Sequence, residues 1–151
     1  MNYGIEFTLE KYFSKNYYFL FTTSLYNSVY RVKPLGWHNT QFNGNWIVTL
    51  TADKDFRVGK KYKANIFSIN TRLLAAGNDR TGDYTFKKEL KPFIRWDFRI
   101  AYKRNLKKYV WELSCDIQNI LNRKNESNND YNINIGILPV LKYRVDFGFT
   151  K

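Results

Sequence analysis

Ionisable side chains of both signs alternate with apolar residues along several stretches of the chain, and their types could support acid–base chemistry. Four carboxylates and three arginines share this alternation: Asp97, Glu112, Asp116, Asp146, Arg95, Arg99 and Arg144. Two carboxyl groups can serve as a general acid and a general base. Mixed charges on neighbouring strands more commonly form ion pairs or remain solvated, and the sequence has neither a glycine-rich phosphate loop nor a serine nucleophile elbow. We therefore expect ion pairs or solvated charge here, no catalytic residue and no enzyme.

The sequence contains one histidine and one cysteine, which excludes a disulfide framework and the usual Cys-rich or His-rich metal sites. Cys115 lies on the apolar side of the alternation and no histidine follows it, so we expect an inert packing residue. His38, between Trp37 and Asn39, could contact a ligand, although packing of a loop on its neighbours is the expected role. The sequence predicts no metal and no cofactor.

The length of 151 residues fits a single domain, 1–151, and 44% apolar residues exclude a disordered chain. The net charge of +12 invites a nucleic-acid interpretation. However, the basic residues cluster near short turns, at Arg57, Lys60, Lys61 and Lys63 and at Lys103, Arg104, Lys107 and Lys108. There they could keep the turns soluble or meet anionic lipid headgroups, and we expect no nucleic-acid partner. The first residues do not form a signal peptide, so we expect either a chain that works in the cytoplasm, or part of a longer, exported precursor, or a processed or recombinant piece.

Apolar and polar residues alternate with a period of two along seven stretches, which predicts β-strands. The stretches lie near 3–10, 18–28, 46–53, 67–73, 94–102, 111–118 and 141–149. Their connections are short at 14–16, 58–61 and 104–107, and long and polar at 32–43, 77–92 and 122–137. We therefore predict an all-β fold, an antiparallel up-and-down meander of about seven long strands with short turns at one end.

Alternation alone does not say whether the apolar face points into a protein core or into lipid. Three features favour lipid. The polar face is rich in charges of both signs, as a wet barrel interior would be. The apolar face carries many Trp, Phe and Tyr side chains, which a small barrel interior would hardly hold at core density. Short turns opposite long loops are typical of outer-membrane barrels. A solvated sheet face also mixes charges, so a soluble barrel remains an alternative.

Four stretches in the same order resemble the C-terminal end of the β-barrel of TonB-dependent receptors of the Bacteroidetes type. They are NYGIEFTLEKYFSKNYYFLFTTSLYNSVYR (2–31), NTQFNGNWIVTLTADKDFRVGKK (39–61), FIRWDFRIAYKRNLKKYVWELSCDIQNILNRKN (93–125) and GILPVLKYRVDFGF (136–149). The resemblance implies that the chain is part of a transmembrane β-barrel, a structural wall segment of an outer-membrane transporter for large nutrients. The short turns would face the periplasm and the long loops the exterior.

The resemblance also implies sites and partners. The long loops would form a ligand mouth with candidate residues Trp37, His38, Asn39, Arg80, Asp83, Tyr84 and Tyr131. Tyr143, Val145, Phe147 and Phe149 resemble the signal that the outer-membrane assembly machinery reads, although Thr150 and Lys151 follow the terminal aromatic residue. Further partners would be outer-membrane lipid, the remainder of the barrel and its plug, and indirectly the TonB complex.

The chain departs from the family by having about seven strands, no plug domain and no TonB-contacting segment. A complete receptor barrel has 22 strands. Two alternatives therefore stay open: a stand-alone small outer-membrane β-barrel, and a soluble β-barrel that binds a small ligand. The sequence does not indicate the transported ligand.

Overall fold

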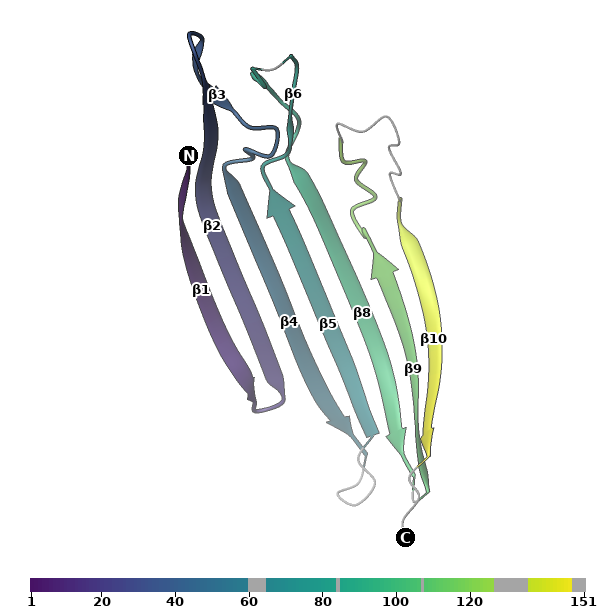
Figure 1. The fold of residues 1–151 in the computed structure, drawn as a ribbon. Coiled ribbons are helices and arrows are strands. Elements are labelled where there is room, and N and C mark those ends of the chain that lie inside the picture. The colour runs from purple at the N-terminus through teal and green to yellow at the C-terminus, as the bar shows by residue number, and fades with distance from the viewer. Residues whose placement is uncertain (60–64, 84, 107, 127–135, 148–151) are drawn as a thin grey trace.

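The computed structural model describes residues 1–59, 65–83, 85–106, 108–126 and 136–147. Seven long strands form one antiparallel sheet in the order β1-β2-β4-β5-β8-β9-β10, each strand beside its neighbour in the meander (Figure 1). Their bounds are β1 Asn2–Ser14, β2 Tyr17–Val32, β4 Trp46–Val58, β5 Asn65–Ala76, β8 Phe93–Asn105, β9 Tyr109–Gln118 and β10 Leu138–Phe147. The described residues contain no helix. The predicted all-β, up-and-down architecture is therefore confirmed.

Short and long connections alternate, as predicted. The turn between β1 and β2 consists of Lys15 and Asn16, both with positive φ (51° and 61°), the backbone conformation that joins two strands by a two-residue turn. β4 and β8 also end at this end of the sheet, whereas β2, β5 and β9 end at the other (Figure 1). We refer to these as the short-turn end and the long-loop end.

Three short strands that the sequence did not predict lie within the long connections. β3, Gly36–Asn39, pairs with the last residues of β2, and β6, Arg80–Thr81, pairs with β7, Lys88–Glu89. β2 is 16 residues long, longer than the predicted strands. Because β2 continues past the first residue of β4, which lies opposite Leu25, its backbone groups on that edge are free to pair with β3 (Figure 1).

The strand register brings the apolar positions of all seven strands onto one side, which we call the apolar face. Ile5 lies opposite Leu25, and Leu25 lies opposite Trp46. Further along the sheet, Ile69, Ile100, Cys115 and Leu141 form an unbroken row across β5, β8, β9 and β10. Side chains directly opposite each other on adjacent strands project to the same face. The apolar face is therefore continuous from one edge strand to the other.

The sheet does not enclose a hydrophobic core. Among the described residues, Ala101 is the one apolar side chain classed as buried. Large residues of the apolar face remain exposed, including Ile5 at 71% and Leu141 at 78% of their surface. Soluble monomers rarely expose apolar patches of this extent. In the structure as described, nothing covers the apolar face.

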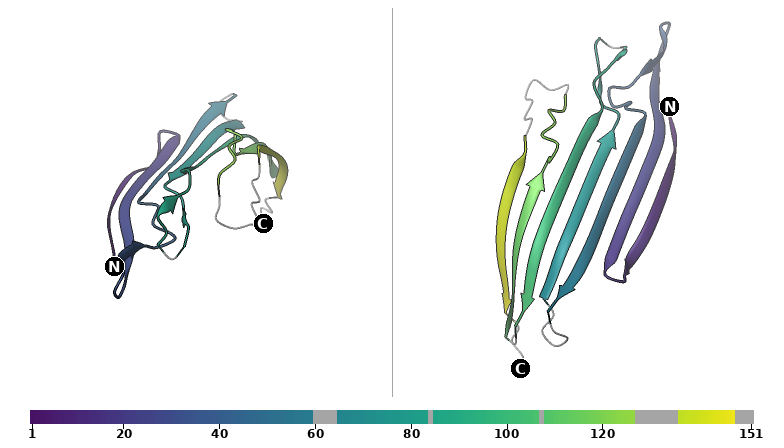
Figure 2. Two further views of the ribbon diagram at one scale, coloured as in Figure 1. Left: turned by 90° about the horizontal axis from the view of Figure 1, so that it is seen from above. Right: turned by 180° about the vertical axis from the view of Figure 1, so that it is seen from behind.

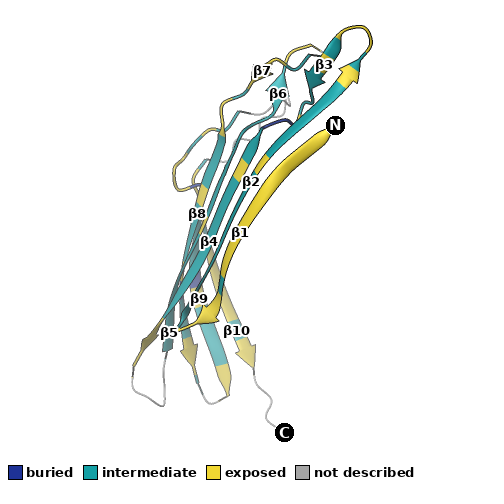
Figure 3. Cartoon of the chain, turned by 90° about the vertical axis from the view of Figure 1, so that its left-hand side faces the viewer, coloured by how far each residue is buried: buried dark blue, intermediate teal, exposed yellow. Residues whose placement is uncertain are grey.

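The sheet is open and curved. Seen from above, it bends into an arch whose two ends, β1 and β10, do not meet (Figure 2). β1 is exposed along almost its whole length (Figure 3). The expected transmembrane barrel would require both edges to be paired, because free backbone groups at a sheet edge are costly in lipid. What the structure shows is one open sheet.

Candidate functional site

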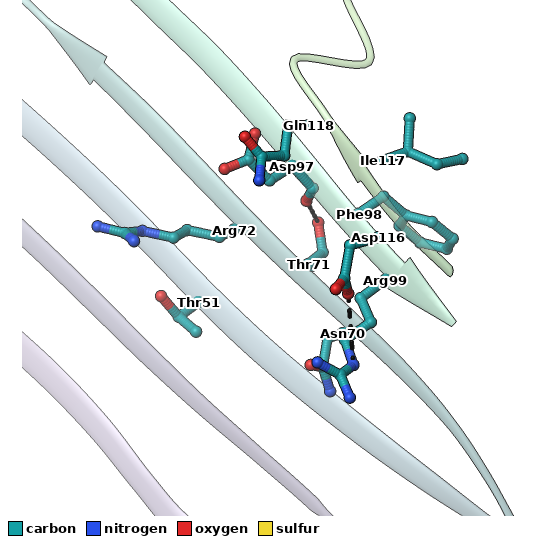
Figure 4. A pocket seen from close by; sticks show the side chains of 10 residues that line it. All are labelled: Thr51, Asn70, Thr71, Arg72, Asp97, Phe98, Arg99, Asp116, Ile117 and Gln118. Carbon is teal, nitrogen blue, oxygen red and sulfur yellow. Dashed lines mark hydrogen bonds and ion pairs between the residues drawn. The ribbon is translucent and has the colours of Figure 1, made fainter. Parts of the chain in front are cut away.

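A hollow of about 300 Å³ lies on the polar side of the sheet, where β4, β5, β8 and β9 run side by side. The polar lining residues that belong to this side of the sheet are Thr51, Asn70, Arg72, Asp97, Arg99, Asp116 and Gln118 (Figure 4). The register places Asn70 opposite Arg99, and Arg99 opposite Asp116. Asn70, Arg99 and Asp116 alternate along their strands with residues of the apolar face. Because successive side chains of a strand point to opposite faces, the polar and charged residues lie together on this side.

A chain of ion pairs crosses the polar face from β8 to β10. An Arg99 Nη atom lies 2.6 Å from Glu112 Oε1, and Arg99 Nε lies 3.5 Å from Asp116 Oδ1. The other carboxylate oxygen of Asp116 lies 3.9 Å from Lys142 Nζ. Each of these groups is partly exposed, so water screens the attraction between them. Arg99 thus links two carboxylates of one strand.

The other two predicted carboxylates also have arginine partners. Arg95 Nε lies 2.8 Å from Asp97 Oδ1, and Asn119 donates its backbone N–H to the same oxygen at 2.9 Å. Arg144 Nε lies 2.9 Å from Asp146 Oδ1. All four carboxylates named as possible acid–base groups therefore take part in ion pairs. Such a face can hold water and polar or charged solutes, and each of these four carboxylates has a cationic partner.

The three predicted ligand-contacting residues of the first long connection lie in β3 but have different environments. Trp37 is exposed over 56% of its surface. His38 stacks at a tilt on Tyr30 of β2, with ring centroids 5.9 Å apart. The Asn39 side-chain oxygen accepts a hydrogen bond from the Asn43 amide at 2.8 Å. Trp37 is thus available to a ligand, whereas His38 and Asn39 pack against neighbouring groups.

Asn43, which the sequence reasoning missed, lies at the centre of a hydrogen-bonded network and is fully buried. Its side-chain oxygen accepts from the Ser28 backbone N–H at 2.9 Å, and its amide donates to Asn27 at 2.7 Å as well as to Asn39. The surrounding letters NGN (43–45) are a turn signal, and Asn45 has a positive φ of 67°. That local signal marks a turn, but it does not identify which asparagine is buried.

Arg80, another predicted mouth residue, holds two connections together. Its Nε donates to the Asn43 carbonyl oxygen at 2.7 Å, and an Nη donates to the Asn45 side chain at 2.7 Å. It also forms an ion pair with Glu89 at 3.2 Å. Nearby, Gly44 and Gly77 approach so closely that a Cβ on Gly77 would overlap the Gly44 carbonyl oxygen. The connections before β4 and after β5 therefore meet backbone to backbone.

The third long connection is joined to the second. Asn78 donates its side-chain amide to the Glu126 carbonyl oxygen at 2.8 Å, and the Lys91 backbone N–H donates to the Glu126 carboxylate at 3.0 Å. At the start of β8, the Asn125 side-chain oxygen accepts a hydrogen bond from the Ile94 N–H at 2.9 Å, and its amide donates to the Ile94 carbonyl oxygen at 3.0 Å. The described parts of all three long connections thus form one hydrogen-bonded assembly at the long-loop end.

Asp83 lies in the loop between β6 and β7. Hydrogen bonds from the Thr85 hydroxyl and backbone N–H hold the pKa of the Asp83 carboxyl below its ordinary value of 3.8, and the nearby charges of Lys87 and His38 act in the same direction. The predicted mouth residues Tyr84 and Tyr131 lie outside the described residues.

Replacing Thr85 by valine is expected to raise the pKa of Asp83 toward 3.8, because the hydroxyl donor is lost while the backbone donor remains. A carboxyl whose pKa is lowered by folding stabilises the fold above its unfolded-state pKa, and this contribution disappears as the pH falls through the folded-state value. A pH titration of the Asp83 carboxyl carbon by NMR checks the shift. An identical titration curve in both proteins would contradict it.

Three of the predicted assembly-signal residues lie in β10 on the apolar face. Tyr143 lies opposite Leu113, Val145 opposite Trp111, and Phe147 opposite Tyr109. The Tyr143 and Phe147 rings contact those of Trp111 and Tyr109, with centroids 6.3 Å and 6.2 Å apart. Phe149 lies outside the described residues. The alternating pattern therefore forms an exposed apolar edge along the described part of β10.

Comparison with protein-family models, with curated proteins and with solved structures found no significant match. Within the described part of the chain, no helix is long and apolar enough to cross a membrane. No cluster of three or more histidine, cysteine or acidic residues in that part is arranged to hold a metal ion.

Proposed function

We propose that this chain forms a wall segment of an outer-membrane β-barrel of the TonB-dependent receptor type, which transports large nutrients. The observation that carries the proposal is the apolar face, which continues across all seven strands while its large side chains remain exposed. Lipid would cover this face, and the polar face with its ion pairs would line the water-filled interior. The receptor type rests on the resemblance of the four sequence stretches.

The number of strands supports a partner that completes the barrel. In an antiparallel meander of seven strands, β1 and β10 run in the same direction. Direct pairing of β1 with β10, in one chain or between two copies of the same orientation, would therefore be parallel. An antiparallel closure requires an odd number of additional strands between the two edges. We propose that the remainder of the receptor barrel supplies them, and that the outer-membrane assembly machinery recognises β10.

In this proposal the long-loop end is the ligand mouth. The hydrogen bonds of Arg80, Asn78 and Glu126 join the described parts of the three connections, so a ligand would meet a preorganised surface. Binding to a preorganised surface costs less conformational entropy than binding to separate mobile loops. Trp37, exposed on β3, offers an aromatic contact at this surface. The plug of the complete receptor would connect uptake to the TonB complex.

Two natural tryptophans, one on the apolar face and one at the long-loop end, provide the test. Trp96 lies on the apolar face of β8 and is 42% exposed, whereas Trp37 lies at the long-loop end. The full chain is reconstituted in phosphatidylcholine vesicles in two forms, one with Trp96 and one with Trp37 as the sole tryptophan, the others being replaced by phenylalanine. Lipids brominated on their acyl chains should quench Trp96 strongly and Trp37 weakly. Equal quenching of both, or failure to float with vesicles, would refute the membrane part of the proposal.

The receptor type is tested separately by the genomic DNA around this coding sequence. An open reading frame that continues upstream into a plug domain would support it. A stop codon directly upstream, combined with strong Trp96 quenching, would refute the receptor type. The proposal that the sheet lies in a membrane would still stand.

A further inference from the structure

Two lysines share one tyrosine ring at the short-turn end of the apolar face. Lys11 Nζ lies 3.8 Å and Lys54 Nζ lies 5.0 Å from the centroid of the Tyr17 ring. The register places Tyr17 directly opposite Lys54 and places Lys11 opposite Phe19, so the three side chains belong to the apolar face. We call Lys11, Tyr17 and Lys54 the basic cluster. Cations at these distances are held by the ring through cation–π attraction.

The fold fixes the position of this cluster. The two-residue turn after β1 lies against β4, where the Asp55 backbone N–H donates to the Asn16 carbonyl oxygen at 2.8 Å. Lys54 Nζ donates to the Lys15 carbonyl oxygen at 3.3 Å, and Lys11 Nζ donates to Ser14 Oγ at 2.7 Å. Both ammonium groups are therefore directed to the same turn rather than spread along the sheet.

The charge of the cluster is not neutralised within the described residues. No carboxylate there lies within 4.0 Å of Lys11, Lys15 or Lys54, and the hydrogen bonds of Lys11 and Lys54 end on neutral oxygens. The acidic neighbours in the strands, Glu10, Asp53 and Asp55, alternate to the opposite face. Like charges that share one site repel each other, so the binding of an anion would be favourable.

Aromatic side chains continue this end of the apolar face across the sheet. Phe56 contacts Phe67 at 6.3 Å between centroids, and Tyr102 contacts Trp111 at 5.6 Å. A row of aromatic residues at one end of a lipid-facing surface marks the boundary between hydrocarbon and headgroups. In the orientation proposed above, the basic cluster lies at this boundary, at the depth of the lipid phosphates.

We propose that Lys11, Lys54 and Tyr17 bind the phosphate of a phospholipid headgroup in the leaflet that faces the short turns. The inference rests on the proposed membrane orientation. The two ammonium groups would contact the phosphate oxygens, the Tyr17 ring would hold the lysines in place, and the adjacent apolar face would contact the acyl chains. The site selects an anionic lipid because the cluster has no acid of its own within ion-pair distance in the described residues.

The test uses a local fluorescent reporter in the full chain. Tyr17→Trp, with the four natural tryptophans replaced by phenylalanine, keeps an aromatic ring in the cluster. Quenching by brominated phosphatidylglycerol is compared with quenching by brominated phosphatidylcholine in mixed vesicles. A lysine near an anionic surface contributes enough attraction to enrich the anionic lipid roughly 5-fold. We expect this preference to disappear in Lys11→Gln/Lys54→Gln and to persist in Arg57→Gln/Lys103→Gln.

The second variant is the matched control. Arg57 and Lys103 lie at the same end of the sheet, but they alternate to the polar face, so the same loss of charge occurs away from lipid. Equal loss in both variants would show general electrostatic attraction and overturn the site. If inorganic phosphate, at matched ionic strength, displaced the lipid completely, the site would bind free phosphate and the lipid assignment would be overturned.

A second measurement avoids the tryptophan replacements. Flotation of the otherwise natural chain with vesicles at low salt is compared for the same two pairs of substitutions. Weaker flotation of the Lys11/Lys54 variant alone, and only with phosphatidylglycerol present, is the expected result. Flotation with pure phosphatidylcholine but no response to phosphatidylglycerol would overturn the headgroup site and leave the membrane proposal standing. No flotation with either vesicle would overturn both.

Discussion

Replacing Leu141 by arginine is expected to destabilise the sheet in a bilayer by about 2–4 kcal/mol, the cost of a basic residue on the lipid face at mid-depth. Leu141 lies near the middle of β10, opposite Cys115 on the apolar face, and 78% of its surface is exposed. Little packing within the described sheet would be lost, so most of the cost would arise from transferring the charge into hydrocarbon. Urea unfolding of the reconstituted chain, followed by tryptophan fluorescence, measures it.

The adjacent residue provides the control. Val140 lies opposite Asp116 on the polar face, so Val140→Arg adds the same charge one position away, toward the ion pairs. We expect a change within about 0.5 kcal/mol, the usual range for surface substitutions. If both variants lost the same stability, or if Leu141→Arg lost it equally in water and in lipid, the apolar face would be a protein contact rather than a lipid contact. The soluble barrel would then be the better interpretation.

The strands could be predicted from the sequence because their signal is local and repeated. Ile94, Trp96, Phe98 and Ile100 alternate with Arg95, Asp97 and Arg99, and the period of two assigns each residue to a face without reference to any other strand. The turn at Lys15 and Asn16 then fixes the first hairpin. Because every connection joins neighbouring strands, the order of the sheet follows from the chain order.

The arrangement of the long connections could not be predicted in the same way. The pairing of Arg80 with the Asn43 carbonyl joins positions 37 residues apart, and the bond from Asn78 to the Glu126 carbonyl joins positions 48 residues apart. Such contacts depend on which loops the sheet brings together, not on the spacing of residue types. The resemblance implied that Arg80 belongs to the loops of a ligand mouth, but its bridging position between two connections is visible only in the structure.

The sequence determines the contacts of the polar face more fully than those of the apolar face. Pairing of charges on the polar face follows from the register, since Arg99 lies opposite Asp116 once the β8–β9 hairpin is aligned. The alternation does not determine whether lipid or protein covers the apolar face. The hydrophobic effect depends on the apolar area removed from water, and any apolar environment removes it equally. That environment is what Leu141→Arg and Val140→Arg distinguish.

Replacing Asn43 by alanine is expected to cost about 3 kcal/mol of folding free energy. The fully buried side chain accepts from the Ser28 backbone N–H and donates to Asn27 and Asn39. A hydrogen bond contributes about 1 kcal/mol, and a buried partner left unsatisfied costs more. Unlike Leu141→Arg, this loss should be the same in detergent and in lipid, because the network lies at the long-loop end.

Asn27→Ala is the graded control for the Asn43 network. It removes one partner of Asn43, together with an exposed bond from Asn27 to the Tyr3 hydroxyl, and leaves the bonds to Ser28 and Asn39 in place. We expect it to cost about 1 kcal/mol. Hydrogen exchange adds a local readout: Asn43→Ala should accelerate exchange of the Ser28 amide, which loses its acceptor, and leave the amides in the β8–β9 hairpin protected. Equal costs for the two variants, with unchanged Ser28 exchange, would show that the Asn43 side chain does not hold the β2–β4 connection against the sheet.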